Sequence, residues 1–464
     1  MPSAIICADG WSGRPLEVEG VEVTLVEGLC LSPRSMVDLV EADEEELVLA
    51  IHRNQANLGE VQSVLRRLGF DPLAVGVLDL ASVGDPAQLP MALAGATARA
   101  RAYPGARPEQ VKLLPADRRT RRGFLSLGTP TYSGAPRIEA ELCVASRGCQ
   151  ICVSQCPAGA LTWSDGSVSY DPNACIACGI CVTACPRSAV MNPVVTPEAV
   201  AAEIGEAVRA GAFGIRYRCR DAIVAGEPGW YQVEVPCTGM LTMGWLLAPL
   251  VLGAASVDAI PCSEGGCGLG NDEKLADTFA DAGVVMDRLG LESSDVASDQ
   301  VIDFPPTALF SSGSTGRLLS LLATTPTTLD FVSADVGTVV IDPETCTVCL
   351  MCSQVCPTGA LVGHQSDEGV SLDMDPRLCV ACGQCVAQCP EVERDAIVMV
   401  RSFDSEDRDR GRREVRRDAT PRCEVCGGPV APEALLARIS SMLGDDHAST
   451  IDLIGRRCVD CRGR

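Results

Sequence analysis

The stretch "CIACGICVTACP", residues 175–186, places four cysteines within eleven residues and ends at a proline. Nearly the same string, "CVACGQCVAQCP", returns at residues 379–390. A CxxCxxCxxxCP run places three thiolates around one 4Fe-4S cluster and sends its fourth thiolate to a second cluster. Two such runs therefore complete two clusters by exchanging their fourth ligands.

The two strings belong to a longer internal repeat. Cys149, Cys152 and Cys156 recur as Cys349, Cys352 and Cys356, and the connecting text matches as well, "CPAGAL" against "CPTGAL". Repetition over this length predicts that a whole functional unit is duplicated.

The second block is regular and predicts two cluster sites. Small residues between the ligands, such as Ala381 and Gly383, let the backbone wrap closely around the sulfides. Zinc is the alternative, but it favours isolated groups of four ligands with longer spacers. The two predicted ligand sets are Cys346, Cys349, Cys352 and Cys389, and Cys379, Cys382, Cys385 and Cys356.

The first block departs from this pattern in its first half. It reads "CVASRGCQICVSQCP", with Ser146 where a cysteine is expected and Cys143 three residues further upstream. We expect Cys143 to be the missing ligand, reached by a longer loop; otherwise the cluster is three-iron or serine-ligated. The two predicted ligand sets are Cys143, Cys149, Cys152 and Cys185, and Cys175, Cys178, Cys181 and Cys156.

Each block resembles a bacterial-type two-cluster ferredoxin, which implies two ferredoxin-like modules with two 4Fe-4S clusters each. Short strand patterns and helical periodicities outside the blocks predict a multidomain chain of mixed α/β and α+β class. The predicted divisions are 1–100 (small α/β domain), 101–136 (linker), 137–195 (first ferredoxin module), 196–330 (parallel-sheet α/β domain), 338–400 (second ferredoxin module), 401–420 (charged linker) and 421–464 (CxxC tail).

Composition narrows the class of protein. The 464 residues include 26 cysteines and carry a formal charge of −23, which disfavours nucleic acid as a partner. The grouped CxxC pairs favour metal ligands over the disulfides of a secreted protein, and the start "MPSAIICADG" has no export signal, so we expect a cytoplasmic location. The apolar run Met240–Ile260 approaches membrane-spanning length, but its proline, its glycines and Asp258 predict a buried helix followed by a buried strand.

In the middle domain, three predicted strands, "FGIRYRC", "WYQVEVPC" and "VDAIPC", each end on a cysteine. In a parallel sheet the carboxyl ends of neighbouring strands meet, so Cys219, Cys237 and Cys262 should lie together, with Cys267 on the "SEGGCGLG" loop. Four converging thiolates predict a metal site; buried, unliganded cysteine is the alternative.

Residues 205–325 resemble the delta subunit of methyl-viologen-reducing hydrogenase through "VPCTGM", "IPCSEGGCGLGN" and "DRLGLESSDV". That resemblance implies a 2Fe-2S cluster at the four cysteines. Members of that family usually carry a cysteine pair at the first strand end, whereas this chain has Arg216 there and only Cys219.

The N-terminal domain resembles the amino-terminal part of the A-type component of heterodisulfide reductase through Cys7, the "LCLSP" around Cys30 and "HRNQANLGEVQSVLRRLGFDPL". With only two cysteines there, we expect both to be structural. None of the three histidines shows a recognisable metal pair or triad.

The tail carries two CxxC pairs, the ligand set of a zinc ribbon or of a rubredoxin-like iron site. Zinc is the favoured ion because two such knuckles can hold a domain that is too small for its own core. The interval between the pairs is longer than the usual ribbon spacing. The four residues are Cys423, Cys426, Cys458 and Cys461.

No glycine-rich dinucleotide motif or phosphate-loop lysine is visible, so electrons are expected to enter or leave through another chain. We therefore predict an electron-transfer subunit of a heterodisulfide reductase or hydrogenase type complex, with four 4Fe-4S clusters, one 2Fe-2S cluster and one zinc or iron ion. Its expected partners in a hetero-oligomer are flavoprotein, hydrogenase, heterodisulfide reductase or formate dehydrogenase type subunits. The alternatives are a self-contained oxidoreductase with a substrate site in the middle or N-terminal domain, and a tail that recognises protein or nucleic acid.

Overall fold

A computed structural model describes residues 2–9, 18, 20–39, 46–105, 110–113, 130–222, 224–261, 269–289, 306–311, 313–366, 369–444 and 447–462. The chain divides into two compact units. The first comprises Met1–Cys143, Cys152–Ser164 and Val168–Ser314, and the second comprises Val144–Ile151, Asp165–Ser167 and Thr315–Arg464.

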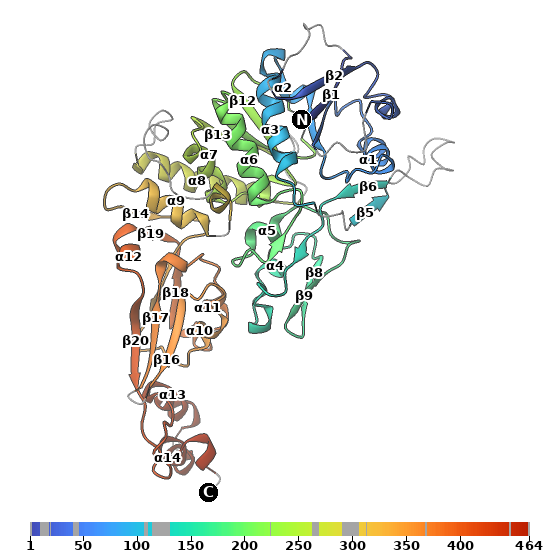
Figure 1. The fold of residues 1–464 in the computed structure, drawn as a ribbon. Coiled ribbons are helices and arrows are strands. Elements are labelled where there is room, and N and C mark those ends of the chain that lie inside the picture. The colour runs from blue at the N-terminus through green and yellow to red at the C-terminus, as the bar shows by residue number, and fades with distance from the viewer. Residues whose placement is uncertain are drawn as a thin grey trace. The chain divides into compact units, whose positions relative to one another are not determined.

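The N-terminal part of the first unit is a parallel four-stranded sheet, seen in blue in Figure 1. The two central strands are buried because helices cover the sheet, whereas the edge strand formed by residues 22–26 is largely half-buried or exposed. The strand order is β2 (Glu22–Val26), β1 (Ser3–Cys7), β3 (Leu47–Ile51) and β4 (Gly76–Asp79). The helices are α1 (Leu58–Arg67), α2 (Leu80–Val83) and α3 (Leu89–Arg101). Asn57 begins α1 by accepting a hydrogen bond from Glu60 N at 3.2 Å.

The middle part of the first unit is a second parallel sheet, in the order β12 (Trp230–Val235), β11 (Gly214–Cys219) and β13 (Ser256–Ile260). The predicted helix and strand in the apolar run are present as α7 (Met243–Val251) and β13, although β13 is only half-buried. Within the described ranges, no helix is both long and apolar enough to cross a bilayer. The remaining helices are α6 (Pro197–Arg209) and α8 (Asp272–Leu289).

Helices α3 and α6 join these two sheets. They lie side by side in Figure 1, with α3 packed on β3 and β4 and α6 on β12. Gly95 of α3 permits this approach: a Cβ atom there would lie 2.5 Å from the hydroxyl oxygen of Tyr231. A short antiparallel pair, β5 (Gln110–Leu113) and β6 (Pro130–Ser133), lies within the segment 101–136, for which the sequence predicts a linker.

Two short antiparallel pairs and two short helices build the first cysteine block. Strand β7 (Arg137–Ile138) pairs with β10 (Val190–Met191), so the first and last strands of the block meet. Between them come α4 (Ile151–Ser154), the pair β8 (Leu161–Ser164) and β9 (Ser167–Tyr170), and α5 (Ile180–Ala184).

The second block repeats this order inside the second unit. Strand β15 (Thr338–Ile341) pairs with β18 (Ile397–Val400), and α10 (Met351–Val355), the hairpin β16 (Leu361–Gln365) and β17 (Gly369–Met374), and α11 (Gln384–Ala387) lie between them in sequence. Helix α9 (Ser314–Leu322) and strand β14 (Thr328–Asp330) precede it.

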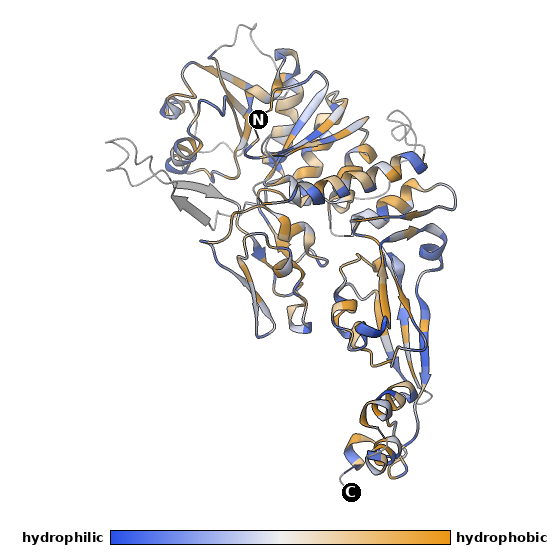
Figure 2. Cartoon of the chain, turned by 180° about the vertical axis from the view of Figure 1, so that it is seen from behind, coloured by the Kyte–Doolittle hydropathy of each residue, from blue (hydrophilic) through white to orange (hydrophobic). Residues whose placement is uncertain are grey.

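Residues 401–420, for which composition predicts a charged linker, instead form ordered structure. They contain β19 (Ser402–Asp404), α12 (Ser405–Arg410) and β20 (Arg413–Ala419), and β20 extends the β16–β17 hairpin into a three-stranded sheet. Figure 2 shows β20 as mostly hydrophilic, and its residues are half-buried or exposed. The charged side chains are compatible with a strand because an antiparallel sheet can leave one face to water.

The tail contains α13 (Glu433–Leu443) and α14 (Ala448–Arg456). These two helices occupy the interval between the CxxC pairs, where a zinc ribbon would place strands.

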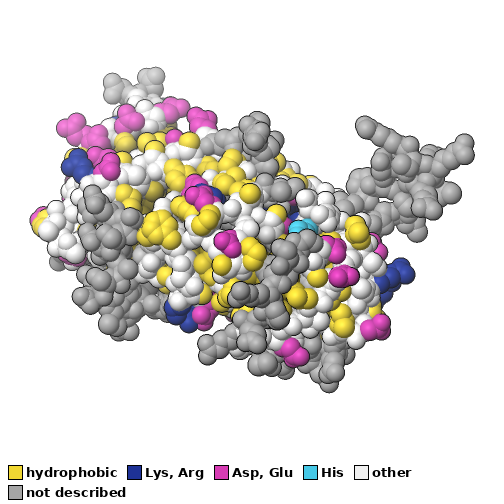
Figure 3. Space-filling view, turned by 90° about the horizontal axis from the view of Figure 1, so that it is seen from above, with side chains coloured by type: hydrophobic (Ala, Val, Ile, Leu, Met, Phe, Trp, Pro, Cys, Tyr) yellow, Lys and Arg dark blue, Asp and Glu magenta, His cyan; other side chains and the backbone are white. Residues whose placement is uncertain are grey.

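The face in Figure 3 carries more acidic than basic side chains, in keeping with the formal charge of −23.

Candidate iron-sulfur and metal sites

The second module contains a small apolar cavity of about 20 Å³ surrounded by four cysteines. Three of them come from the first CxxCxxCxxxCP run, and Cys389 comes from the end of the second run. Ile341, Leu372 and Ile397 close the cavity on other sides. The cysteines are Cys346, Cys349, Cys352 and Cys389.

A second cavity of about 20 Å³ in the same module collects the remaining four cysteines. Here Cys356, the fourth cysteine of the first run, joins three cysteines of the second run: Cys379, Cys382 and Cys385. The exchange of the fourth cysteine between the two runs is thus present in the geometry. Their individual roles as cluster ligands stay predictions.

The backbone between these cysteines adopts left-handed conformations that are unusual for residues with side chains. Val348, Leu350 and Ala381 have φ of 52°, 62° and 47°. Backbone amides nearby point at sulfur, as in the hydrogen bond from Leu361 N to Cys356 Sγ at 3.5 Å. The strained turns and the sulfur-directed N–H groups fit a polynuclear cluster, whose sulfur atoms accept hydrogen bonds.

Burial shapes the acidity of these thiols. It raises the pKa of Cys352 and Cys385 to about 12 and that of Cys379 to about 11, because the apolar surroundings disfavour thiolates. Thiolates are the metal-binding form, so a bound cation would offset the cost of ionising these three buried thiols. This donor set fits a 4Fe-4S cluster.

The first module has a matching cavity of about 20 Å³. Hydrogen bonds from Ala160 N to Cys156 Sγ at 3.3 Å and from Ala177 N to Cys175 Sγ at 3.4 Å repeat the pattern of amides aimed at sulfur. Burial raises the pKa of Cys181 to about 12. The four cysteines around the cavity are Cys156, Cys175, Cys178 and Cys181.

The middle domain holds the turn of this site directly. Arg220, just beyond the end of β11, donates hydrogen bonds to the carbonyl oxygens of Ile176 at 2.6 Å and Ala177 at 3.2 Å. Both carbonyls belong to the turn between Cys175 and Cys178. The guanidinium therefore fixes the turn and places a positive charge beside the predicted cluster.

In the irregular half of the first module, one backbone hydrogen bond has a counterpart in the second module. Cys143 N donates to the Glu139 carbonyl at 3.0 Å, as Cys346 N donates to the Asp342 carbonyl at 3.0 Å. Cys143 thus occupies the position in its module that Cys346 occupies in the other. Ser146 lies further along, in the 3₁₀ turn η3 (Ala145–Arg147), which accommodates the longer spacing.

The other cysteines of this half are buried or half-buried. Cys152 and Cys185 are buried in the core of the module, and Cys143 packs against that core. Cys149 is half-buried just before α4. Ala189 N donates to Cys185 Sγ at 3.3 Å, another amide aimed at a predicted ligand.

In the middle domain, Cys219 ends β11 and Cys237 lies two residues beyond β12. A hydrogen bond between the two thiols, together with burial, raises the pKa of Cys219. Cys237 Sγ also accepts a hydrogen bond from Gly239 N at 3.4 Å. Parallel pairing therefore brings these two residues together as expected, whereas Cys262 and Cys267 lie outside the described residues.

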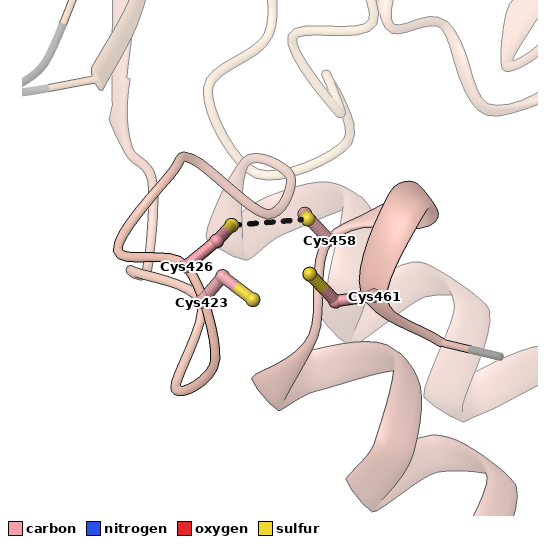
Figure 4. Close-up of side chains that lie close together, drawn as sticks. All are labelled: Cys423, Cys426, Cys458 and Cys461. Carbon is pink, nitrogen blue, oxygen red and sulfur yellow. Dashed lines mark hydrogen bonds between the residues drawn. The ribbon is translucent and has the colours of Figure 1, made fainter. Parts of the chain in front are cut away.

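The tail brings its four cysteines together (Figure 4). All four sulfur atoms lie within 4.8 Å of one another, and the Sγ atoms of Cys426 and Cys458 are 3.5 Å apart. Backbone hydrogen bonds lower the pKa of Cys423 to about 6. Four thiolates at this separation fit one tetrahedral ion, zinc or iron.

The N-terminal sheet holds a further cluster that the sequence did not indicate. Cys7, Cys30 and His52 each offer a donor atom within 4.8 Å of the others, and Cys30 Sγ lies 3.6 Å from His52 Nδ1. Cys7 ends β1, and His52 directly follows β3. The sequence could have indicated this cluster through the neighbouring ends of its parallel strands, because such ends bring together residues that are distant in sequence.

Comparison with known protein families agrees with the cysteine geometry. Residues 338–390 and residues 145–190 each match a family model described as a 4Fe-4S dicluster domain. No curated protein matches the chain. Neither family match reaches the N-terminal domain, the middle domain or the tail. The chain therefore contains two 4Fe-4S dicluster domains, which give about two clusters each, and these ferredoxin-type domains suggest electron transfer.

Proposed function

We propose that this chain is a multi-cluster electron-transfer subunit of an oxidoreductase complex. The observation that carries the proposal is the exchange geometry: the two cavities of the second module each take three cysteines from one run and one cysteine from the other. When bound, 4Fe-4S clusters accept and release single electrons. The protein side chains position the sulfur ligands and exclude water, and the backbone directs amide hydrogens at sulfur.

The proposed ligand sets are those predicted from the sequence, two in each dicluster domain. Cys143 is proposed as the ligand that replaces the expected cysteine at Ser146. This assignment is supported by the equivalent backbone hydrogen bonds of Cys143 and Cys346.

Two further centres are proposed outside the dicluster domains. Cys219 and Cys237, with Cys262 and Cys267, would hold a 2Fe-2S cluster; the proximity of Cys219 and Cys237 and the resemblance to the hydrogenase delta subunit support this. The four tail cysteines would hold one zinc ion, an interpretation supported by the mutual approach of their sulfur atoms.

The proposed partners are redox proteins of the heterodisulfide reductase and hydrogenase type, in the cytoplasm. They would carry the flavin or metal centre at which electron pairs are exchanged with a substrate. The family resemblances of the N-terminal and middle domains support this part of the proposal.

Metal and sulfide analysis of the anaerobically reconstituted full chain tests the proposal. Four 4Fe-4S clusters and one 2Fe-2S cluster require about 18 iron atoms per chain. Low-temperature EPR of the dithionite-reduced protein should show interacting 4Fe-4S signals. An iron content near zero, with zinc in its place, would overturn the proposal. Loss of only about two iron atoms on substitution of Cys219 and Cys237 would identify the 2Fe-2S site separately.

A further inference from the structure

A cavity of about 200 Å³ lies inside the first unit, between the N-terminal sheet and the middle sheet. Strand β4 and helix α3 line one side, and strands β11 and β12 line the other. Ala177, in the turn between Cys175 and Cys178, also lies in its wall. The described residues of the wall include none of the predicted cysteine ligands, so the cavity is separate from the iron-sulfur and metal sites.

The ionisable side chains that line this cavity carry more positive than negative charge. Among the described residues of its wall there are four arginines and three acids. The whole chain is strongly acidic, with a formal charge of −23, so a net positive cavity is a local exception. The residues are Arg53, Arg99, Arg218 and Arg220, and Asp79, Glu203 and Glu234.

The acids are already engaged by protein groups. Glu234 pairs with both Arg53 and Arg218, the latter at 2.8 Å. Glu203 accepts hydrogen bonds from Arg99 at 2.8 Å and from the Tyr231 hydroxyl at 2.9 Å. Burial raises the pKa of Glu203 despite the opposing attraction of Arg99.

Arg220 supplies the excess charge, and its guanidinium faces both the cavity and the turn that carries the predicted, anionic cluster. The acid that pairs with it, Asp221, is 3.9 Å away and its side chain is 75% exposed, so water screens that interaction. Two of the guanidinium's donors go to the Ile176 and Ala177 carbonyls, which carry no net charge. A guanidinium offers five N–H donors, and an anion in the cavity would pair with this one.

Two polar atoms in the wall lack hydrogen-bond partners among the described residues: Arg218 Nε and Gln232 Oε1. The Arg218 side chain is only 4% exposed. The amide nitrogen of Gln232 donates to the Val224 and Ala225 carbonyls, which fixes the orientation of the amide and leaves its oxygen as an acceptor. Unpaired buried polar atoms are costly, and a ligand that pairs them after a small side-chain rotation would relieve that cost.

These features define the chemistry of a ligand. The arginines require an anionic acceptor, and a carboxylate matches guanidinium geometry. Gln232 Oε1 requires a donor, for which a hydroxyl suits better than an ammonium group because the net positive charge of the wall disfavours a cation. A cavity of about 150 Å³ holds benzene, so about 200 Å³ corresponds to a ligand of roughly eight non-hydrogen atoms.

We propose that this cavity binds a small hydroxycarboxylate, whose carboxylate pairs with Arg218 and Arg220 and whose hydroxyl donates to Gln232 Oε1. Because Arg220 also holds the turn between Cys175 and Cys178, the bound anion lies next to the predicted cluster of the first module. Binding of the anion should therefore change the electronic environment of that cluster. The binding itself does not require the cluster.

Calorimetric titration of the full reconstituted chain with L-malate and with L-lactate tests the proposal, at constant ionic strength set by chloride. Succinate is the matched ligand that lacks only the hydroxyl of malate. We expect saturable binding of L-malate, weaker binding of L-lactate because it fills less of the cavity, and binding of succinate about tenfold weaker than malate. The EPR signal of the reduced protein should change on addition of malate.

Two variants locate the site. Arg220→Gln should weaken malate binding about tenfold to a hundredfold, because a charge-assisted hydrogen bond is lost. Gln232→Leu should abolish the preference for malate over succinate. Arg209→Gln removes the same charge from a surface pair with Glu206 and should leave binding unchanged. Visible absorbance and thermal unfolding confirm that each variant is folded and loaded.

The proposal is overturned if neither hydroxy acid binds saturably to the folded native chain. It is also overturned if Arg220→Gln and Arg209→Gln weaken malate binding equally, since the anion would then be held by general charge. If the chain contains no iron but still binds malate with the expected preference, the electron-transfer proposal fails and the ligand site stands.

Discussion

The two dicluster domains share one arrangement of elements and differ in what surrounds it. In both, the first and last strands pair, a short helix lies within the first cysteine run, a hairpin follows that run, and a second short helix precedes the last cysteine. The first domain inserts the turn η3 between Cys143 and Cys149. The second adds β20 to the edge of its hairpin and keeps the regular cysteine spacing.

This difference separates the features that a cluster site requires from the features that stabilise the surrounding domain. The equivalent hydrogen bonds of Cys143 and Cys346 persist although the following loop differs in length. The position of the ligand relative to the first strand is therefore retained, while the loop to the next cysteine varies. The added strand β20 follows β19 and α12, whose side chains Phe403 and Arg408 are buried in the second unit.

The largest expected effect comes from removing the two equivalent cysteines. Cys143→Ser and Cys346→Ser should each disrupt one cluster, with a loss of about one to four iron atoms depending on whether a three-iron cluster survives. Iron analysis and EPR of the oxidised protein, in which a three-iron cluster is detectable, measure the outcome.

Ser146 provides the control for that comparison. Ser146→Ala should keep the full iron content, because the residue lies in η3 rather than at the position of Cys346. If Ser146→Ala lost iron and Cys143→Ser kept its full iron content, Ser146 and not Cys143 would be the counterpart of Cys346.

The next largest effect concerns the core of the second unit. Phe403 is fully buried, at 0% exposure, with the Arg408 guanidinium 5.7 Å from its ring centre. Phe403→Ala should lower the free energy of unfolding by about 3–5 kcal/mol through lost burial and a cavity. Urea unfolding of the reconstituted chain measures it. Val398→Ala, at a position 44% exposed in the same unit, serves as the control and should cost much less.

A smaller effect is expected within α12, where a buried and an exposed arginine lie two residues apart. Arg408 is 5% exposed and donates to the Pro376 carbonyl at 2.6 Å, which fixes the chain just before Cys379. Arg408→Gln should cost about 2–3 kcal/mol in unfolding free energy because a buried carbonyl loses a charged donor. Arg410 pairs at the surface with Glu406 and Asp407, and Arg410→Gln should change stability by less than about 0.5 kcal/mol.

Equal effects of these two arginine substitutions would show that α12 does not support the second module. The same unfolding experiment decides this, with iron content as a check that both variants are loaded.

The smallest effect compares two aspartates at the same place in the two modules. Asp375 N and Asp171 N each donate to the carbonyl of the residue just before the hairpin, Ala360 and Ala160 respectively. Asp375 also holds Arg377 through two hydrogen bonds at 2.9 Å and 2.8 Å, and this pairing lowers its pKa. Asp375→Asn should therefore cost about 1–2 kcal/mol at neutral pH, and Asp171→Asn less.

The pH dependence of this difference follows from the direction of the pKa shift. A carboxylate whose pKa is lowered in the folded state contributes stability above the ordinary value of about 3.9 and loses it as pH falls through the lowered pKa. The difference between native protein and Asp375→Asn should thus stay constant from about pH 7 to about pH 5. A difference that already shrinks over this interval would contradict the lowered pKa.

Much of the candidate site could be predicted because cluster ligands lie close together in the chain. The CxxC spacing alone brings Cys379, Cys382 and Cys385 around one cavity, and the duplicated runs indicate the exchange with Cys356. The parallel strands of the middle domain, and with them the meeting of Cys219 and Cys237, were also predictable from short apolar runs.

Other features depended on side chains finding partners far away in sequence. His52 approaches Cys7 and Cys30 only because β1, β2 and β3 align in parallel. The charged stretch 401–420, which composition predicts to be a linker, is ordered because β17 offers an edge for β20 and Arg408 finds buried carbonyls. Composition could not reveal either partner.

The sequence by itself determined that the chain carries two 4Fe-4S dicluster domains, since ligand spacing of a few residues limits where sulfur atoms can lie. Only the tertiary structure decided that two α/β sheets meet around a positively charged cavity beside one of these domains. The arginines of its wall come from separate segments, Arg99 from α3, Arg218 from β11 and Arg53 from the turn after β3, and the packing of α3 against α6 helps to bring these segments together. Local spacing acts through covalent geometry, whereas this cavity depends on contacts that form only when the whole unit folds.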